Sequence, residues 1–117
     1  MNYGVAYPDD YEGLPLLVYL HGAGERGVNF DHVYRHAIPK LLREGREFPA
    51  VVLYPQCPGP FIWNNMVKEL KEIIDSVVEE YGIQKDRIML TGSSMGGYGT
   101  WEMGMCYPEF FAAIAPV

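Results

Sequence analysis

The sequence predicts an α/β domain in which helices cover both faces of a mostly parallel sheet. Three observations support this: short apolar segments alternate with amphipathic helical segments, the apolar segments show no in–out alternation, and each ends at or near glycine or proline. Continuous apolar segments are typical of strands that are buried on both faces. The regular order of strand and helix implies right-handed crossovers and three layers of helix, sheet and helix.

Four apolar segments are predicted to be the main strands. In chain order they are Leu14–Leu20, Ala50–Tyr54, Arg87–Thr91 and Phe110–Ala115. Each is followed by glycine or proline within two residues, and these residues interrupt strands. The segment Asn2–Tyr7 is predicted to form an additional strand at the edge of the sheet.

Three helices are predicted between these strands. The longest, Asn65–Tyr81, carries apolar residues at helical spacing, can be capped at its start by Asn64 or Asn65, and is followed by Gly82 in the position of a left-handed terminal residue. A shorter helix is expected over Pro39–Glu44, with proline in its first turn and glycine beyond its end. The third helix begins after Ser94 and ends near Cys106.

Length and charge exclude several classes of protein. The 117 residues allow a single domain, residues 1–117, and the net charge of −6 argues against a protein that binds nucleic-acid phosphates. No apolar run approaches the ~18 residues of a membrane helix. Met1–Asp10 has neither the basic start nor the apolar segment of a signal peptide. The sequence therefore predicts no nucleic acid or membrane partner, and it leaves the location as cytoplasmic or unknown.

The strongest chemical signal is the pentapeptide Gly92-Ser93-Ser94-Met95-Gly96, which fits the pattern GxSxG. It lies directly after a predicted strand and directly before a predicted helix, which is the context that a nucleophilic serine on a sharp turn requires. Glycine on each side removes the Cβ atoms that would collide with the neighbouring backbone. Ser94 is therefore predicted to be a catalytic nucleophile at the carboxyl edge of the sheet.

A second signal is the glycine-rich loop at residues 21–27, with the sequence HGAGERG. Acyl transfer needs two backbone N–H groups that point at the oxyanion of the tetrahedral intermediate. One donor is expected from Met95, the residue after the nucleophile. The other is expected from the glycine-rich loop, at Ala23 or, less favoured, at Gly24.

Three other side chains of this loop have two interpretations each. His21 is expected to order the loop through hydrogen bonds rather than to transfer protons. Glu25 and Arg26 either form an ion pair that fixes the loop or are simply solvated, and the first interpretation is slightly favoured.

Together the segments LLVYLHGAGERG, VVLYPQCP and RIMLTGSSMGGYGTW resemble the α/β-hydrolase superfamily. Within it, the chain is most similar to bacterial carboxylesterases grouped with feruloyl esterases, dienelactone hydrolase-like proteins and predicted phospholipases. The resemblance runs from about Tyr3 to Val117. It implies a Ser-His-acid triad with Ser94 as nucleophile, and an oxyanion hole formed by Met95 and Ala23.

The same analogy concerns two residues after the second main strand. Gln56 and Trp63 are expected to line the acyl or alcohol pocket of an esterase. The alternative is that Gln56 is a turn residue and Trp63 a half-buried aromatic residue, and neither interpretation is favoured.

The sequence departs from the family in the other two members of the triad. The order in this fold is serine, acid, histidine, but the residues after Ser94 include two glutamates, Glu102 and Glu109, and no histidine. All three histidines lie upstream, at His21, His32 and His36. The chain therefore looks like the first part of a longer hydrolase, with acid and base expected from outside this stretch.

Two weaker patterns point to other functions. Gly22–Gly27 also fits the dinucleotide motif GxGxxG, but residues 28–30 do not continue a helix and the next strand ends without an acid. His32 and His36 have the spacing of a zinc site but no third ligand. We expect neither a nucleotide nor a metal, and no organic cofactor.

Three hypotheses remain: a serine esterase acting on a small-molecule ester, an inactive hydrolase fragment that assembles, and a less favoured nucleotide-binding module. An uncovered edge strand at Phe110–Ala115 predicts a homo-oligomer, of which a domain-swapped form is one version. Cys57 and Cys106 either form a disulfide or, as the favoured interpretation, stay reduced.

Overall fold

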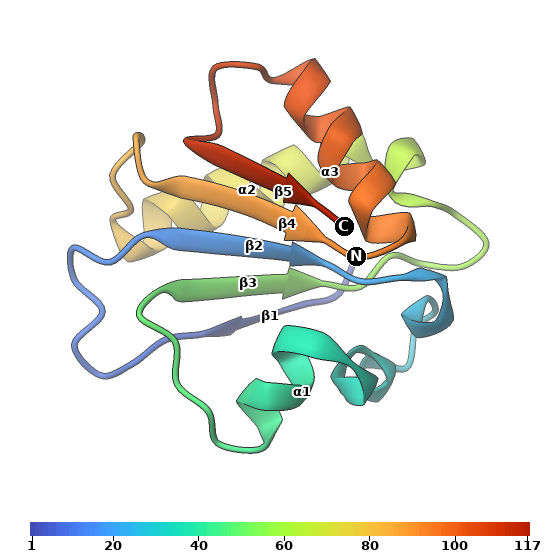
Figure 1. Cartoon of the computed structure of the whole chain (residues 1–117), viewed down its shortest axis with the longest axis horizontal. Coiled ribbons are helices and arrows are strands. Elements are labelled where there is room, and N and C mark those ends of the chain that lie inside the picture. The colour runs from blue at the N-terminus through green and yellow to red at the C-terminus, as the bar shows by residue number, and fades with distance from the viewer.

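The computed structural model of the protein describes residues 1–117 and contains one five-stranded sheet in the order β1-β3-β2-β4-β5 (Figure 1). The strands β2, β3, β4 and β5 run parallel to one another, and only β1, which pairs with β3, is antiparallel. The prediction of a mostly parallel sheet with an extra edge strand is therefore confirmed. The strands are β1 (Tyr3–Ala6), β2 (Leu16–Leu20), β3 (Val51–Pro55), β4 (Ile88–Gly92) and β5 (Ala113–Pro116).

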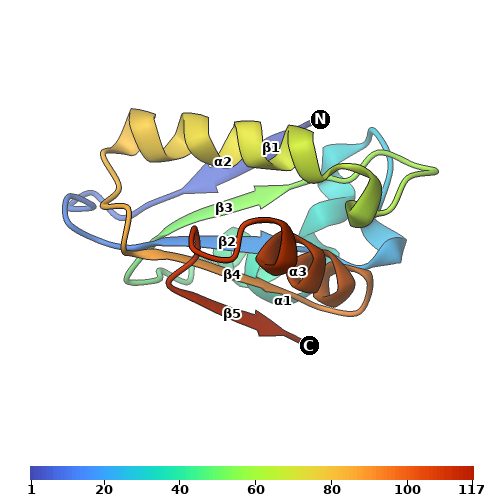
Figure 2. The same ribbon diagram turned by 90° about the horizontal axis from the view of Figure 1, so that it is seen from above.

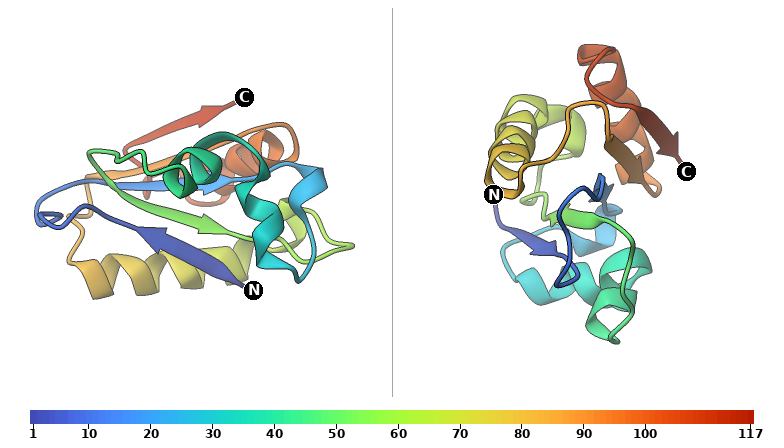
Figure 3. Two further views of the ribbon diagram at one scale, coloured as in Figure 1. Left: turned by 90° about the horizontal axis from the view of Figure 1, so that it is seen from below. Right: turned by 90° about the vertical axis from the view of Figure 1, so that its left-hand side faces the viewer.

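Helices lie on both faces of this sheet. α2 (Val67–Tyr81) and α3 (Met95–Cys106) cover one face, and α1 (Ala37–Arg43) covers the other together with the 3-10 helix η2 (Phe30–Arg35), as Figures 2 and 3 show. Gly82 ends α2 with φ 64° and ψ 37°, the left-handed conformation expected there. The predicted three-layer arrangement is confirmed.

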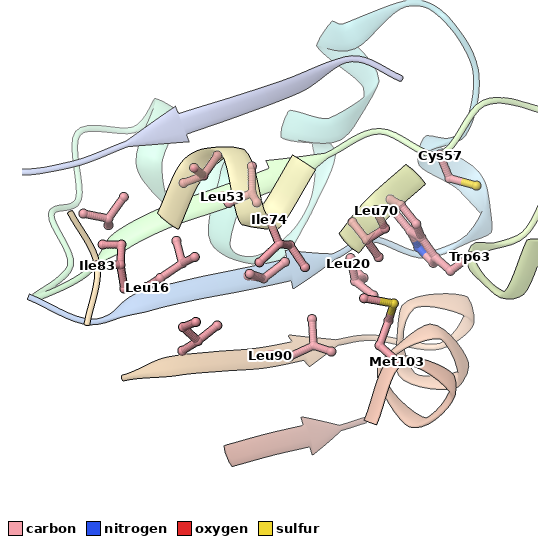
Figure 4. Close-up of a cluster of buried hydrophobic side chains, with 14 of the residues drawn as sticks. Leu16, Leu20, Leu53, Cys57, Trp63, Leu70, Ile74, Ile83, Leu90 and Met103 are labelled. Carbon is pink, nitrogen blue, oxygen red and sulfur yellow. The ribbon is translucent and has the colours of Figure 1, made fainter. Parts of the chain in front are cut away.

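Two hydrophobic cores lie on the two sides of the sheet. In β3, Val51 and Leu53 face the core beneath α2, whereas Val52 and Tyr54 face the core beneath α1. Since successive strand residues point to opposite faces, a strand buried on both sides must be apolar at every position. This requirement explains why the apolar segments of the sequence do not alternate. Figure 4 shows the larger core, in which side chains of α2 and α3 pack on β2, β3 and β4.

The register of the sheet brings two distant loops together. β2 and β4 pair so that Leu20 lies opposite Gly92, and both strands end there. Because parallel strands end at the same edge of a sheet, the loop after β2 and the turn after β4 become neighbours. The glycine-rich loop and the GxSxG turn, about 70 residues apart in the chain, thus meet at one edge.

Several boundaries differ from the predicted ones. β2 and β5 begin later than predicted, at Leu16 and Ala113, and residues 14–15 and 110–112 lie outside the strands. The segment at residues 30–35 forms η2, which the sequence analysis did not predict. His36 follows this helix with extended backbone angles, φ −143° and ψ 161°, so His32 and His36 do not share a helix face. No helix of the structure has both the length and the apolarity that a membrane crossing requires.

Candidate active site

Ser94 occupies a sharp turn between β4, which ends at Gly92, and α3, which begins at Met95. Its backbone angles are φ 57° and ψ −114°, a conformation that residues with a side chain rarely adopt. Its residue surface is exposed to solvent. Strain of this kind costs on the order of 1–3 kcal/mol and persists only where the surrounding structure enforces it.

The glycines around Ser94 enforce the turn because the backbone leaves no space for larger residues. A Cβ atom on Gly96 would overlap the main-chain carbonyl group of Leu20, and one on Gly92 would overlap the carbonyl oxygen of Gly96. Two hydrogen bonds fix the turn to neighbouring strands: Ser93 N–H donates to the Leu20 carbonyl over 3.2 Å, and Ser94 N–H donates to the Val117 carbonyl over 3.3 Å.

Two backbone N–H groups next to Ser94 have no acceptor in the protein. Met95 N–H is the first of α3, and Ala23 N–H is the first of the 3-10 helix η1 (Ala23–Glu25); neither donates a hydrogen bond. The two donors belong to adjoining segments, because a Cβ atom on Gly22 would lie 3.6 Å from the Ser93 carbonyl oxygen and 3.9 Å from the Ser94 Cβ. Gly24 N–H is also free. The N–H groups that the sequence predicts as donors thus lie in segments that adjoin Ser94.

His21 is buried and forms hydrogen bonds with both ring nitrogens. Its Nδ1–H donates to the Gly22 carbonyl over 2.6 Å, and its Nε2 accepts the Cys57 N–H over 2.9 Å. This pattern requires the neutral ring with the proton on Nδ1. Burial lowers the pKa of His21 below its ordinary value of 6.5, which is consistent with a neutral imidazole. The ring orders the loop and has no free nitrogen for Ser94.

Gln56 and Trp63 are also buried, with 1% and 0% of their surface exposed. Gln56 Nε2 donates to the carbonyls of Glu25 (3.0 Å) and Asn29 (2.8 Å), and Trp63 Nε1 donates to the carbonyl of His21 (2.9 Å). Both side chains hold the glycine-rich loop from the core side. Their proposed contact with an acyl or alcohol group stays a prediction.

Glu25 and Arg26 do not form an ion pair. The Glu25 carboxyl group is buried and accepts the Gly22 N–H over 3.2 Å. Arg26 donates from Nε to the Ala23 carbonyl over 3.0 Å and from one terminal nitrogen to the Phe61 carbonyl over 3.3 Å. Both residues fix the loop, but each does so through the backbone. A sequence cannot distinguish this from an ion pair, because both need the same residue types at the same spacing.

No histidine contacts Ser94. His21 is engaged elsewhere, and His32 and His36 lie in and after η2, on the other face of the sheet. A cavity of about 280 Å³ opens beside Ser94. Its walls are Ser94, Gly97, Tyr98, Trp101, Pro116 and Val117. The cavity therefore contains the predicted nucleophile but no histidine.

The two weaker sequence patterns, one for a dinucleotide and one for a metal ion, do not form such sites in the structure. The GxGxxG loop forms a single 3-10 turn rather than the start of a long helix, so it lacks the helix N-terminus on which a dinucleotide pyrophosphate binds. No group of three or more His, Cys, Asp or Glu side chains is placed to hold a metal ion. Cys57 and Cys106 are both free thiols.

The chain is similar to esterases in sequence and in structure. It is 34% identical to a thermostable esterase of known crystal structure, with a TM-score of 0.78 over 97% of this chain and 36% of that chain. The chain has the fold of the α/β-hydrolase-type esterases. In the α/β-hydrolase fold the nucleophile lies on a sharp turn between a strand and a helix.

Sequence relatives agree with this assignment to the α/β-hydrolase-type esterases. A bifunctional acetylxylan esterase/xylanase of Neocallimastix patriciarum is 32% identical over an alignment of 107 positions, which covers 87% of this chain and 15% of the relative. A poly(3-hydroxyalkanoate) depolymerase C of Paucimonas lemoignei is 25% identical over an alignment of 118 positions, gaps included, which covers 88% of this chain and 27% of the relative. No family model matches the chain. The chain thus spans less than a third of the length of these relatives.

Proposed function

We propose that this chain carries the nucleophile and the oxyanion hole of a serine esterase that hydrolyses carboxylic esters. The observation that carries the proposal is the strained backbone of Ser94 at the end of β4, beside two N–H groups without acceptors. Similarity to a thermostable esterase at 34% identity supports ester hydrolysis as the general activity.

In the proposed reaction the Ser94 hydroxyl oxygen attacks the ester carbonyl carbon while its proton passes to a base. The N–H groups of Met95 and Ala23 stabilise the negative oxygen that forms, an effect worth ~10²–10³ in rate for one such donor. The C–O bond to the alcohol then breaks, and the alcohol leaves with a proton. Water attacks the acyl group on Ser94 and releases the carboxylic acid.

The base is the part of the reaction that this chain does not place beside Ser94. A serine hydroxyl without an adjacent base is a weak nucleophile at neutral pH. In a related catalytic site, the rate that remains after the loss of a triad member is roughly 10³–10⁴ above that in water. We therefore propose slow, Ser94-dependent ester hydrolysis by the 117-residue chain, with acid and histidine supplied from elsewhere in the active enzyme.

The test is covalent labelling with a fluorophosphonate probe, combined with hydrolysis of one short-chain aryl ester. We expect slow labelling of the wild-type chain, no labelling of Ser94→Ala, and unchanged labelling of Ser93→Ala, a matched control one residue away. Labelling that persists in Ser94→Ala would contradict the proposal. Fast turnover that is lost in one of three single variants, His21→Ala, His32→Ala or His36→Ala, would instead identify a base within the chain.

A second proposal concerns assembly and rests on the free edge of the sheet. β5 pairs with β4 on one side only, and Ala113 and Ala115 are exposed. Beside it, Trp101 and Met105 of α3 have 55% and 66% of their surface exposed. Unpaired strand edges and exposed apolar patches favour association with another chain. We propose that two copies of the chain associate through this edge, and the variant Ala115→Lys tests this association.

A further inference from the structure

Glu25 is the one acidic residue that the fold buries. Its residue surface is 6% exposed, whereas the other acids of the chain lie at least partly in solvent. A carboxyl group is costly to bury unless hydrogen bonds replace its hydration. A buried acid in a loop beside the nucleophile therefore calls for a specific explanation.

Hydrogen bonds hold Glu25 at both ends. Its Oε2 accepts the Gly22 N–H over 3.2 Å, and its main-chain carbonyl accepts Gln56 Nε2 over 3.0 Å. Gln56 is itself 1% exposed and also donates to the Asn29 carbonyl. The side chain of Glu25 is thereby fixed to the core and can in turn fix the residue it contacts, Gly22.

The hydrogen bond between Gly22 and Glu25 makes one N–H group of the loop differ from the next two. Gly22 N–H donates to Glu25, whereas the N–H groups of Ala23 and Gly24 donate to nothing in the protein. Gly22 has φ −82° and ψ −175°, and these two angles relate the direction of its own N–H to that of the Ala23 N–H. An anchor on the Gly22 N–H therefore also sets the direction of the next donor.

The carboxyl group also lies near the nucleophile. A Cβ atom on Gly22 would be 3.9 Å from Glu25 Oε1 and equally 3.9 Å from the Ser94 Cβ. The Glu25 carboxyl group and the Ser94 side chain therefore both lie near the position that a Cβ atom on Gly22 would occupy.

We propose that Glu25 is a positioning residue for the oxyanion loop: its carboxyl group holds the Gly22 N–H and so directs the Ala23 N–H toward the substrate oxygen at Ser94. It acts through Gly22 and does not exchange protons with the substrate. The catalytic consequence rests on the proposed esterase function, but the structural role does not.

This role needs an acceptor atom at the end of a side chain of this length. Glutamine has such an acceptor, a carbonyl oxygen, and methionine has a similar size without it. The pair Glu25→Gln and Glu25→Met therefore separates the hydrogen bond from simple filling of space. Asp31→Ala is the control, because Asp31 is an exposed acid whose carboxylate accepts a hydrogen bond from Arg43 rather than from Gly22.

The first readout is amide hydrogen exchange by NMR, which needs no activity. In the wild-type chain we expect the Gly22 amide to exchange at least tenfold more slowly than the amides of Ala23 and Gly24. Protection of Gly22 should persist in Glu25→Gln and Asp31→Ala and be lost in Glu25→Met. Equal exchange at Gly22 and Ala23 in the wild-type chain would overturn the proposal even if the Met variant did not fold.

The second readout is the rate of fluorophosphonate labelling at Ser94. A misdirected oxyanion donor should slow labelling of Glu25→Met by ~10²-fold, with Glu25→Gln close to the wild-type rate. Wild-type labelling of Glu25→Met, or an equal loss in both Glu25 variants, would overturn the positioning role. Absence of Ser94-dependent labelling in the wild-type chain would refute the esterase proposal, and the exchange experiment would still decide the role of Glu25.

Discussion

The indole Nε1–H of Trp63 donates a hydrogen bond to the main-chain carbonyl of His21 over 2.9 Å, across 42 positions of sequence. The two rings also pack together, with centroids 4.9 Å apart. Because His21 begins the glycine-rich loop, this contact ties the loop to the helix η3 (Trp63–Asn65) and to the core beneath α3. The loop beside Ser94 is thus held by side chains from the segment that follows β3.

The first prediction concerns this contact. Trp63→Phe removes the N–H and leaves the buried His21 carbonyl without that donor, so we expect the free energy of unfolding to fall by ~1–3 kcal/mol. Trp101→Phe is the matched control, because Trp101 is 55% exposed and should change stability by less than about 0.5 kcal/mol. Urea unfolding measures both values. Equal stability of the two variants would show that the hydrogen bond does not contribute.

The second prediction concerns the backbone contact at Gly96. Gly96→Ala places a Cβ on the Leu20 carbonyl group, so β2 and α3 must separate, and we expect a loss of at least ~3 kcal/mol or a failure to fold. In Gly24→Ala the new Cβ has no atom within 4 Å, and Gly24 does not have a positive φ, so little change is expected. Chemical denaturation of both proteins distinguishes them. A folded Gly96→Ala of wild-type stability would contradict the described turn.

The third prediction concerns pH. Burial lowers the pKa of His21 in the folded state below 6.5, so the unfolded state binds more protons as the pH falls. His21 therefore contributes stability that is present above its unfolded pKa and is lost as the pH falls through the folded pKa. We expect the free energy of unfolding to decrease on acidification from about pH 7 to pH 5, with a smaller decrease in His21→Gln. His36→Gln, at an exposed position, should keep the wild-type slope.

The sequence is most informative where a local rule decides the structure. Glycine at positions 92 and 96, between an apolar strand and a helix, is sufficient to predict the turn at Ser94. The contacts of Gln56 and Trp63 could not be predicted in the same way, since their partners lie more than 25 residues away and are main-chain carbonyls that every residue has. The helix η2 could not be predicted because 3-10 turns are short and have no periodic apolar pattern.

The fourth prediction concerns the two thiols. Burial raises the pKa of Cys57 to about 11, so at neutral pH it is protonated and also shielded from reagents. Cys106 is exposed at the end of α3. We expect a thiol reagent such as Ellman's reagent to modify one cysteine in the native protein and two in denaturant. Rapid modification of both in the native state would show that the loop after β3 opens readily.

The fifth prediction tests the proposed association through β5. Ala115→Lys places a charge on the exposed face of the edge strand and should shift the protein toward monomer at high concentration. Val28→Lys is the control, because Val28 is an apolar residue with 85% of its surface exposed, outside the strand. Light scattering measures the mass of both variants and of the wild-type chain. A wild-type chain that stays monomeric would refute the proposal.

The hydrogen bond from Ser94 N–H to the carbonyl of Val117 links Ser94 to the residue that follows β5 at the edge of the sheet. Edge elements with few buried contacts open most often in native proteins. When β5 detaches, Ser94 loses one of the hydrogen bonds that keep its backbone in a strained conformation, so the local order of Ser94 should fluctuate with that strand. During synthesis, at ~5–20 residues per second, the turn at Ser94 leaves the ribosome before the segment that supports it. The backbone of Ser94 therefore acquires its final geometry only after β5 has been translated and has paired with β4.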